Sequence, residues 1–265
     1  PDIRFKSSTR KAINLPEETK AQAAQRVVQD KFNRFEQINK WTAEHGVKLS
    51  EQANVYGAEE RYHGRVSTRL QDFREKKVQP LIKKIQEAGF TMQDISEFLE
   101  AQHTVEANAQ VQKISGDPKA TAAGITDAEA TAYLAKAKPE LATLANELRG
   151  ITTSTKNLLV RSGVISRDMA DAWDATYQFY VPLKGGEDSQ AQSTGSGPGM
   201  SVNGKQKRRL GHGKRDEHIV ENIMRDHERA VIAAEKNLVG QHLIKLALEV
   251  ATLDPNLITV GKPEK

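Results

Sequence analysis

Apolar side chains recur at helical spacing along most of this sequence, and this periodicity constrains the fold more than any other feature. Between residues 24 and 250 they return every three to four positions, in runs that end at glycines such as Gly46, Gly89 and Gly163. Runs of this kind predict amphipathic helices that each bury one face. We therefore expect an all-α protein, an elongated multi-helix bundle of six or seven helices.

Local signals mark where several of these helices begin and end. Thr91–Asp94 and Thr126–Glu129 have the spacing of capping boxes, in which a threonine hydroxyl and an acidic side chain exchange hydrogen bonds with backbone amides. Ser166 is expected to cap another short helix. Pro80 lies inside the second run and should kink or split it, and Pro139 should end or bend the helix that Thr126 opens.

A glycine-rich stretch interrupts the helical pattern between Gly185 and Gly213. It holds eight glycines and few large apolar residues, so a long loop is predicted there, with a short hairpin around residues 200–202 as an alternative for part of it. The longest helix should follow. The expected organisation is one domain with a helical bundle over residues 1–184, a basic loop over 185–215, and a helix and tail over 216–265 that pack on the bundle.

Composition narrows the classes of function. Charged residues make up 28% of the chain and apolar residues 37%, with a mean hydropathy of −0.62, which suits long amphipathic helices. The formal net charge of +4 is a weak indication of an anionic partner. The sequence has no cysteine, which excludes disulfides, thiolate metal sites and cysteine nucleophiles within it. No apolar run approaches the roughly 18 residues of a membrane span. The sequence begins at Pro1, as expected of a piece of a longer protein.

Residues 199–206, GMSVNGKQ, resemble a phosphate-binding loop that ends in Gly-Lys-Ser or Gly-Lys-Thr. In such a loop a buried strand delivers backbone amides to the phosphates, and the hydroxyl after the lysine binds magnesium. Here Gln206 replaces the hydroxyl residue, and a glycine- and serine-rich stretch precedes Gly199 in place of a strand. A nucleotide site is therefore not expected.

The same stretch carries a dense group of cations without any acidic residue among them. Six basic residues fall within eleven positions: Lys205, Lys207, Arg208, Arg209, Lys214 and Arg215. One interpretation is sequence-independent contact with nucleic-acid phosphates. The other is a solvated loop, or arginines that pair with acidic helix faces of protein. No aromatic residue is interleaved, so stacking on single-stranded bases is not predicted.

The most specific chemical hypothesis is a metal site formed by two Glu-x-x-His pairs, Glu60/His63 and Glu100/His103. Two such pairs on facing helices, with two further glutamates, build a di-metal site in helical bundles. Arg61 and Arg65 bring positive charge close to His63, and no further pair of glutamates on neighbouring helices is evident. A helical di-metal protein is the alternative enzyme interpretation, and structural hydrogen bonding is favoured over it.

The same histidines fit a structural role. His63 and Arg65 on one predicted helix, and His103, Glu106 and Asn108 on another, are expected to form a buried polar cluster that sets the register of the two helices. No serine lies in a nucleophile-elbow pattern, and no histidine arrangement matches a known nucleophilic site. The sequence therefore predicts no catalytic residue and no cofactor.

Several short motifs, in order along residues 54–248, together carry a family resemblance. They are Ala58–Val66 (AEERYHGRV), His103 with Glu106 and Asn108, Gly124–Ala130, Tyr177–Gly185, Ser201-Val202 with Lys207–Gly211, and Ala234–Asn237. In this arrangement the chain resembles a helical region of the large polyvalent proteins of phages and prophages.

The resemblance implies a non-enzymatic module of a giant polyprotein that is packaged in the virion and delivered into the bacterium with the genome. Expected partners are other virion or ejection proteins, further copies of the chain, and phage DNA. The expected location is the virion interior and then the host envelope or cytoplasm. An accessory domain of a co-injected antirestriction or DNA-processing polyprotein is the alternative. The lack of cysteine and the polar helical build suit a module that unfolds to pass a narrow tail and refolds afterwards.

Overall fold

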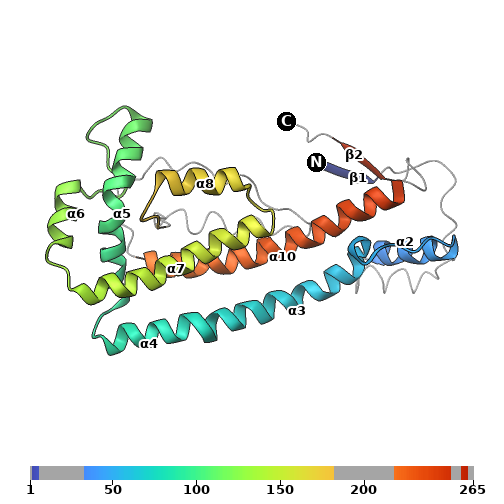
Figure 1. Ribbon diagram of the computed structural model, residues 1–265, viewed down its shortest axis with the longest axis horizontal. Coiled ribbons are helices and arrows are strands. Elements are labelled where there is room, and N and C mark those ends of the chain that lie inside the picture. Colours follow the sequence, from blue (N-terminus) through green and yellow to red (C-terminus); the bar gives the residue numbers. More distant parts are fainter. Residues whose placement is uncertain (1, 6–32, 182–217, 252–257, 262–265) are drawn as a thin grey trace, which may run out of the picture. The chain divides into compact units, whose positions relative to one another are not determined.

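The computed structural model describes residues 2–5, 33–181, 218–251 and 258–261 (Figure 1). Apart from one pair of short strands, this part of the chain is helical, which confirms the all-α class that the periodicity predicts. The helices are α2 (Asn33–Glu44), α3 (Val55–Phe73), α4 (Gln79–Glu87), α5 (Met92–Ser115), α6 (Asp127–Leu134), α7 (Pro139–Arg161), α8 (Arg167–Thr176) and α10 (Ile219–Ala251), with a 3₁₀ turn η1 (Glu51–Ala53) and a π-helical segment η2 (Arg74–Val78). The predicted hairpin at residues 200–202 lies outside the described residues.

The chain divides into two compact units. Unit 1 comprises Pro1–Arg65 and Glu235–Lys265, and unit 2 comprises Val66–Ala234. Helices α3 and α10 contribute residues to both units, so the division falls inside these helices. With 33 residues, α10 is the longest described helix, in the place where the sequence predicts the longest one.

Unit 2 is built around a hydrophobic core to which α3, α4, α5, α7 and α10 contribute. Its fully buried side chains include Ile85, Ile95, Leu99, Leu148 and Ile219. These residues occupy the predicted apolar stripes, and burial of each large aliphatic side chain contributes roughly 1.5–3 kcal/mol relative to exposure. The central element is α5, whose residues contact α6 and α7.

Unit 1 buries residues of α3 and of the C-terminal half of α10, among them Val55, Ala58, Leu246 and Val250. It also contains two short strands, β1 (Asp2–Phe5) and β2 (Ile258–Gly261), which pair antiparallel with Asp2 opposite Gly261. This pair has no signal in the sequence, because four residues are too few for a period-two pattern to stand out from the helical one.

The helix starts follow the local signals. Thr91 and Thr126 each form a complete capping box, with Asp94 and Glu129 respectively, and the Ser166 hydroxyl accepts a hydrogen bond from the backbone amide of Met169 at 3.2 Å. These contacts use the backbone amides that a helix start leaves without partners. Gly116, which ends α5, has φ of +73°, a conformation that glycine adopts without steric penalty.

The two prolines have different outcomes. The π-helical segment η2 comes directly before Pro80, which lies in the first turn of α4. A proline ring clashes with the carbonyl four residues earlier, and the wider π turn relieves that clash, so the predicted disturbance takes this form. Pro139 does not end a helix: α6 already ends at Leu134, and Pro139 opens α7, where a missing amide costs no hydrogen bond.

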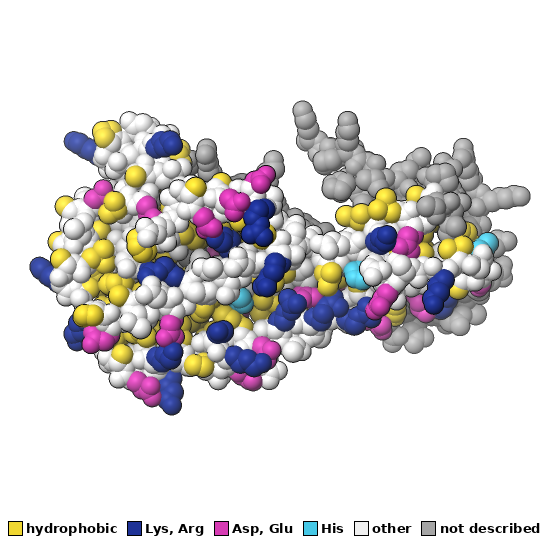
Figure 2. Space-filling model, in the orientation of Figure 1, with side chains coloured by type: hydrophobic (Ala, Val, Ile, Leu, Met, Phe, Trp, Pro, Cys, Tyr) yellow, Lys and Arg dark blue, Asp and Glu magenta, His cyan; other side chains and the backbone are white. Residues whose placement is uncertain are grey.

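The described helices carry charges of both signs on the face shown in Figure 2, where basic and acidic side chains lie among one another. Several of them form exposed ion pairs within a helix or between helices, such as Lys76–Asp72 and Lys84–Glu147. Pairs of this kind contribute little to stability, since both partners remain hydrated.

Candidate functional site

The six predicted nucleic-acid contacts, residues 205–215, lie outside the described residues. The two flanks of the glycine-rich basic stretch are described, and they are the residues up to Val181 and the residues from His218 onward. Both flanks belong to unit 2. Their contacts fix where the chain leaves the described part of unit 2 and where it re-enters it.

The upstream flank is fixed by Glu106 of α5. The backbone amide of Gln178 donates to Glu106 Oε2 at 2.7 Å, and that of Phe179 donates to Oε1 at 2.8 Å. The buried His103 lies 2.9 Å from Oε1 through its Nδ1. A carboxylate that accepts hydrogen bonds from two successive amides holds an extended backbone in one orientation, so the chain leaves α8 along a defined path. Two residues later, Val181 enters the hydrophobic core.

Aromatic side chains surround this contact. The ring of His103 lies edge-on to Tyr177 and Tyr180, with centroids 5.3 and 5.9 Å apart. The Arg149 guanidinium stands over the Phe179 ring at 5.2 Å and hydrogen-bonds the side chain of Gln102. Burial lowers the pKa of Arg149, yet an arginine so placed remains a cation. The cation–π contact adds a further restraint on the upstream flank.

The downstream flank is fixed by burial. Ile219 and Val220, the first residues of α10, are buried in the same core as Val181. The amide of Val220 lies 3.5 Å from the hydroxyl of Ser96, another buried residue of α5. Ser96 and Glu106 are ten residues apart on one helix, about 15 Å along its axis. Both flanks of the basic stretch are therefore anchored on α5.

Asn108 has a separate role in unit 2. Its amide nitrogen donates to the backbone oxygen of Ile125 at 2.9 Å and to Asp127 at 2.8 Å, and its oxygen accepts from the amide of Ala122 at 2.8 Å. The side chain is buried. It supplies hydrogen-bond partners to backbone groups of the connection between α5 and α6. It fixes that connection and takes no part in the contacts of Glu106.

The other two members of the predicted polar cluster lie in unit 1. Arg65 forms an ion pair with the buried Glu235 of α10, with Nε and Oε2 2.6 Å apart, and also donates to the backbone oxygen of Ala58. His63 is exposed, with its ring edge-on to Tyr62. The described contacts of the five residues are thus Arg65 with Glu235, His63 with Tyr62, His103 with Glu106, and Asn108 with the connection before α6.

Around the Arg65–Glu235 pair, burial raises the pKa of Tyr62, and the carboxylates of Glu59 and Glu235 act in the same direction. Burial also raises the pKa of Glu59, opposed by His63, Lys236 and Arg65. Glu235 was not predicted as a partner of Arg65, although the segment Ala234–Asn237 belongs to the motifs that carry the family resemblance. Glu235 is buried and lies 170 positions from Arg65, so no local spacing in the sequence indicates that the two residues pair.

The residues of the di-metal alternative do not form one described centre. Glu60 and His63 are exposed residues of unit 1, whereas Glu100 and His103 are buried residues of unit 2. Among the described residues, no three side chains of His, Asp, Glu or Cys are grouped so that they could hold a metal ion. His103 instead has Glu106 as its partner.

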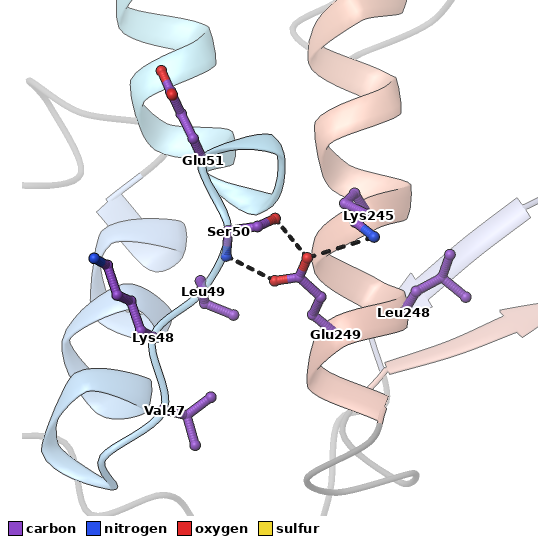
Figure 3. A pocket seen from close by; sticks show the side chains of 8 residues that line it. All are labelled: Val47, Lys48, Leu49, Ser50, Glu51, Lys245, Leu248 and Glu249. Carbon is purple, nitrogen blue, oxygen red and sulfur yellow. Dashed lines mark hydrogen bonds and ion pairs between the residues drawn. The ribbon is translucent and has the colours of Figure 1, made fainter.

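An open groove in unit 1 had no signal in the sequence. It has a volume of about 770 Å³ and lies between the 47–51 loop and α10, lined by Val47, Lys48, Leu49, Ser50, Glu51, Lys245, Leu248 and Glu249 (Figure 3). Glu249 accepts hydrogen bonds from both the amide and the hydroxyl of Ser50, at 2.9 and 2.5 Å. These bonds, with Lys245 nearby, lower the pKa of Glu249. The carboxylate therefore fixes the loop and is already engaged by the protein itself.

The solvent-facing side of α10 in unit 1 has three exposed apolar side chains. Leu238, Ile244 and Leu248 have exposed fractions of 36%, 38% and 58%. None of the described helices is long and apolar enough to cross a membrane. Comparison with protein-family models, with curated proteins and with solved structures gives no match. The family resemblance therefore stays a prediction from the sequence.

Proposed function

We propose that this chain is a non-enzymatic interaction module of a phage internal virion or ejection protein, in which the residues 205–215 contact DNA. The observation that carries the proposal is the anchoring of both flanks of the basic stretch on α5, through Glu106 on one side and Ser96 on the other. The described residues on either side of the segment are therefore both bound to α5 of unit 2.

The charge pattern supports a polyanion as the partner. The segment has six basic and no acidic residues over eleven positions, whereas the charges of the described helices are mixed in sign. Each cation that neutralises a phosphate releases condensed counterions, which drives binding without any reading of base sequence. This fits packaging or delivery with a genome, where DNA of any sequence must be contacted.

Assembly with further copies or other virion proteins is the second part of the proposal. The exposed Leu238, Ile244 and Leu248 on α10 offer apolar area for such contacts. Light scattering in solution measures the mass of the purified chain directly. A mass above that of one chain which falls on Leu248→Glu would support assembly through α10, and a monomer at all concentrations would remove self-assembly from the proposal.

DNA binding is tested by triple neutralisation, Lys207→Gln with Arg208→Gln and Arg209→Gln. The matched control neutralises three exposed lysines of η2 and α4, Lys76, Lys77 and Lys83, and so loses the same charge. In a gel-shift or fluorescence titration with duplex DNA at low salt, the first variant should bind at least tenfold more weakly than the control. Equal binding by both variants would mean that net charge, and not the segment, determines DNA affinity.

A further inference from the structure

His227 of α10 lies at a junction of three helices in unit 2. Its ring stacks on Phe73 of α3, with centroids 4.1 Å apart and an angle of 29° between the planes. Its Nδ1 lies 2.8 Å from the Thr155 hydroxyl of α7. One side chain thus joins α10 to both α3 and α7, by a ring contact on one side and a hydrogen bond on the other.

The hydrogen-bond pattern assigns the proton. The Thr155 hydroxyl donates to the backbone oxygen of Ile151 at 2.8 Å, so its single proton is already used. Thr155 must therefore accept from His227, which places the ring proton of the neutral form on Nδ1. Uptake of a second proton occurs at Nε2 and leaves a full charge at the junction.

The charged groups near the ring offset that charge only in part. On α10 the neighbouring carboxylate is Glu228, which is paired with Arg74 of η2 at 3.0 Å. On α7 the neighbour of Thr155 is Lys156, which is bound to Asp174 of α8. Phe73 of α3 offers only the face of its ring. Burial lowers the pKa of His227 below its usual value, and the attraction of Glu228 opposes this without reversing it.

The direction of this shift sets the direction of the pH effect. A histidine whose pKa is lower in the folded state is protonated more readily in the unfolded chain. Its contribution to stability is complete at a pH well above the ordinary histidine value of about 6.5 and is lost progressively as the pH falls below that value. A neutral ring therefore favours the folded junction.

We propose that the His227 junction is an acid-sensitive latch of unit 2, which holds α10 against α3 and α7 with a neutral imidazole and loosens when the ring takes up a second proton. The latch is independent of DNA binding by residues 205–215. It gives the module a built-in dependence on the pH of its surroundings, and lower pH favours the opening of unit 2.

The test uses the one tryptophan in each unit. Trp41 belongs to unit 1 and Trp173 to unit 2, and the sequence holds no others. In a Trp41→Phe background, the fluorescence of Trp173 reports the unfolding of unit 2 by urea, measured at pH 7.5 and pH 5.0. The variant His227→Asn keeps an amide N–H in place of Nδ1–H but cannot take up a proton. His218→Asn, at an exposed position just before α10, is the matched control.

The expected result is a lower urea midpoint at pH 5.0 than at pH 7.5 in the background and in His218→Asn, with a clearly smaller difference in His227→Asn. An unchanged difference in His227→Asn overturns the proposal. NMR titration of the His227 ring in the folded protein provides a second measurement that does not depend on any variant being stable. A midpoint below the ordinary histidine value of about 6.5 supports the latch, and a midpoint at that value or above it excludes the latch.

Discussion

Removal of the charge of Arg65 should destabilise unit 1 strongly. The side chain of its partner Glu235 is only 2% exposed, and their atoms are 2.6 Å apart. In Arg65→Met the arginine stem is kept, but the carboxylate is left buried without its cation. Breaking one side of a buried pair in this way typically costs about 3–5 kcal/mol, more than a 100-fold change in the folding equilibrium.

A matched control lies on the continuation of the same helical path. Arg74 of η2 also pairs with a glutamate of α10, Glu228, but here the side chains are 61% and 32% exposed. Hydrated pairs of this kind contribute about 0.2–1 kcal/mol, so Arg74→Met should shift stability by no more than that. The contrast isolates burial, because both changes remove an arginine from an Arg–Glu pair with α10.

The assay is urea unfolding followed by circular dichroism. The Trp41 fluorescence reports unit 1 for Arg65→Met, and the Trp173 fluorescence reports unit 2 for Arg74→Met, each with the other tryptophan replaced by phenylalanine. A further variant that combines Arg65→Met with Glu235→Leu should recover most of the lost stability, because a buried ion pair is replaced by apolar side chains of similar volume. Two results would contradict the role of the buried pair: a loss of unfolding free energy in Arg65→Met no larger than that in Arg74→Met, or a double variant no more stable than Arg65→Met alone.

Three further predictions concern unit 2. Asn108→Ala leaves the buried amide of Ala122 without an acceptor and should cost at least about 1–3 kcal/mol in urea unfolding; a loss of less than about 0.5 kcal/mol would contradict the role of Asn108. Thr126→Ala removes the capping box of α6 and should cost about 0.5–2 kcal/mol, whereas Thr131→Ala on the same helix should cost less. Glu106→Gln should accelerate hydrogen exchange of the Gln178 and Phe179 amides by about 10–100-fold and leave that of Val220 unchanged, and equal acceleration of all three would show general loosening instead.

The features that the sequence predicted correctly are those that local chemistry determines. Thr91 and Thr126 form capping boxes because the partner acid stands three residues away on the same turn. The prediction for Pro139 was wrong for a local reason as well. A proline interrupts a helix when it lies in the interior, but it is favoured at the first position of a helix. The preceding run of alanines and lysines gives no sign of where α6 ends.

The polar contacts required information that a single sequence does not hold. The sequence singles out Arg65, His103, Glu106 and Asn108 as members of a polar cluster. His103 and Asn108 are buried, and Arg65 and Glu106 form close hydrogen bonds. Which groups meet depends on the packing of distant segments: Glu235 is 170 positions from Arg65, and the Gln178 amide is 72 from Glu106. Backbone amides have no signature in a sequence, so the role of Glu106 as an anchor could not be predicted.

The salt dependence of DNA binding tests the central claim most directly. Affinity for duplex DNA falls with salt on a double-logarithmic plot with a slope of about 0.9 for each phosphate neutralised. With three of its six cations removed, the Lys207/Arg208/Arg209 variant should lose about 2 to 3 from the slope of the unaltered chain, and the Lys76/Lys77/Lys83 control should retain it. Equal slopes for the two variants, or a slope near zero for the unaltered chain, would contradict the account of this protein as a DNA-contacting module.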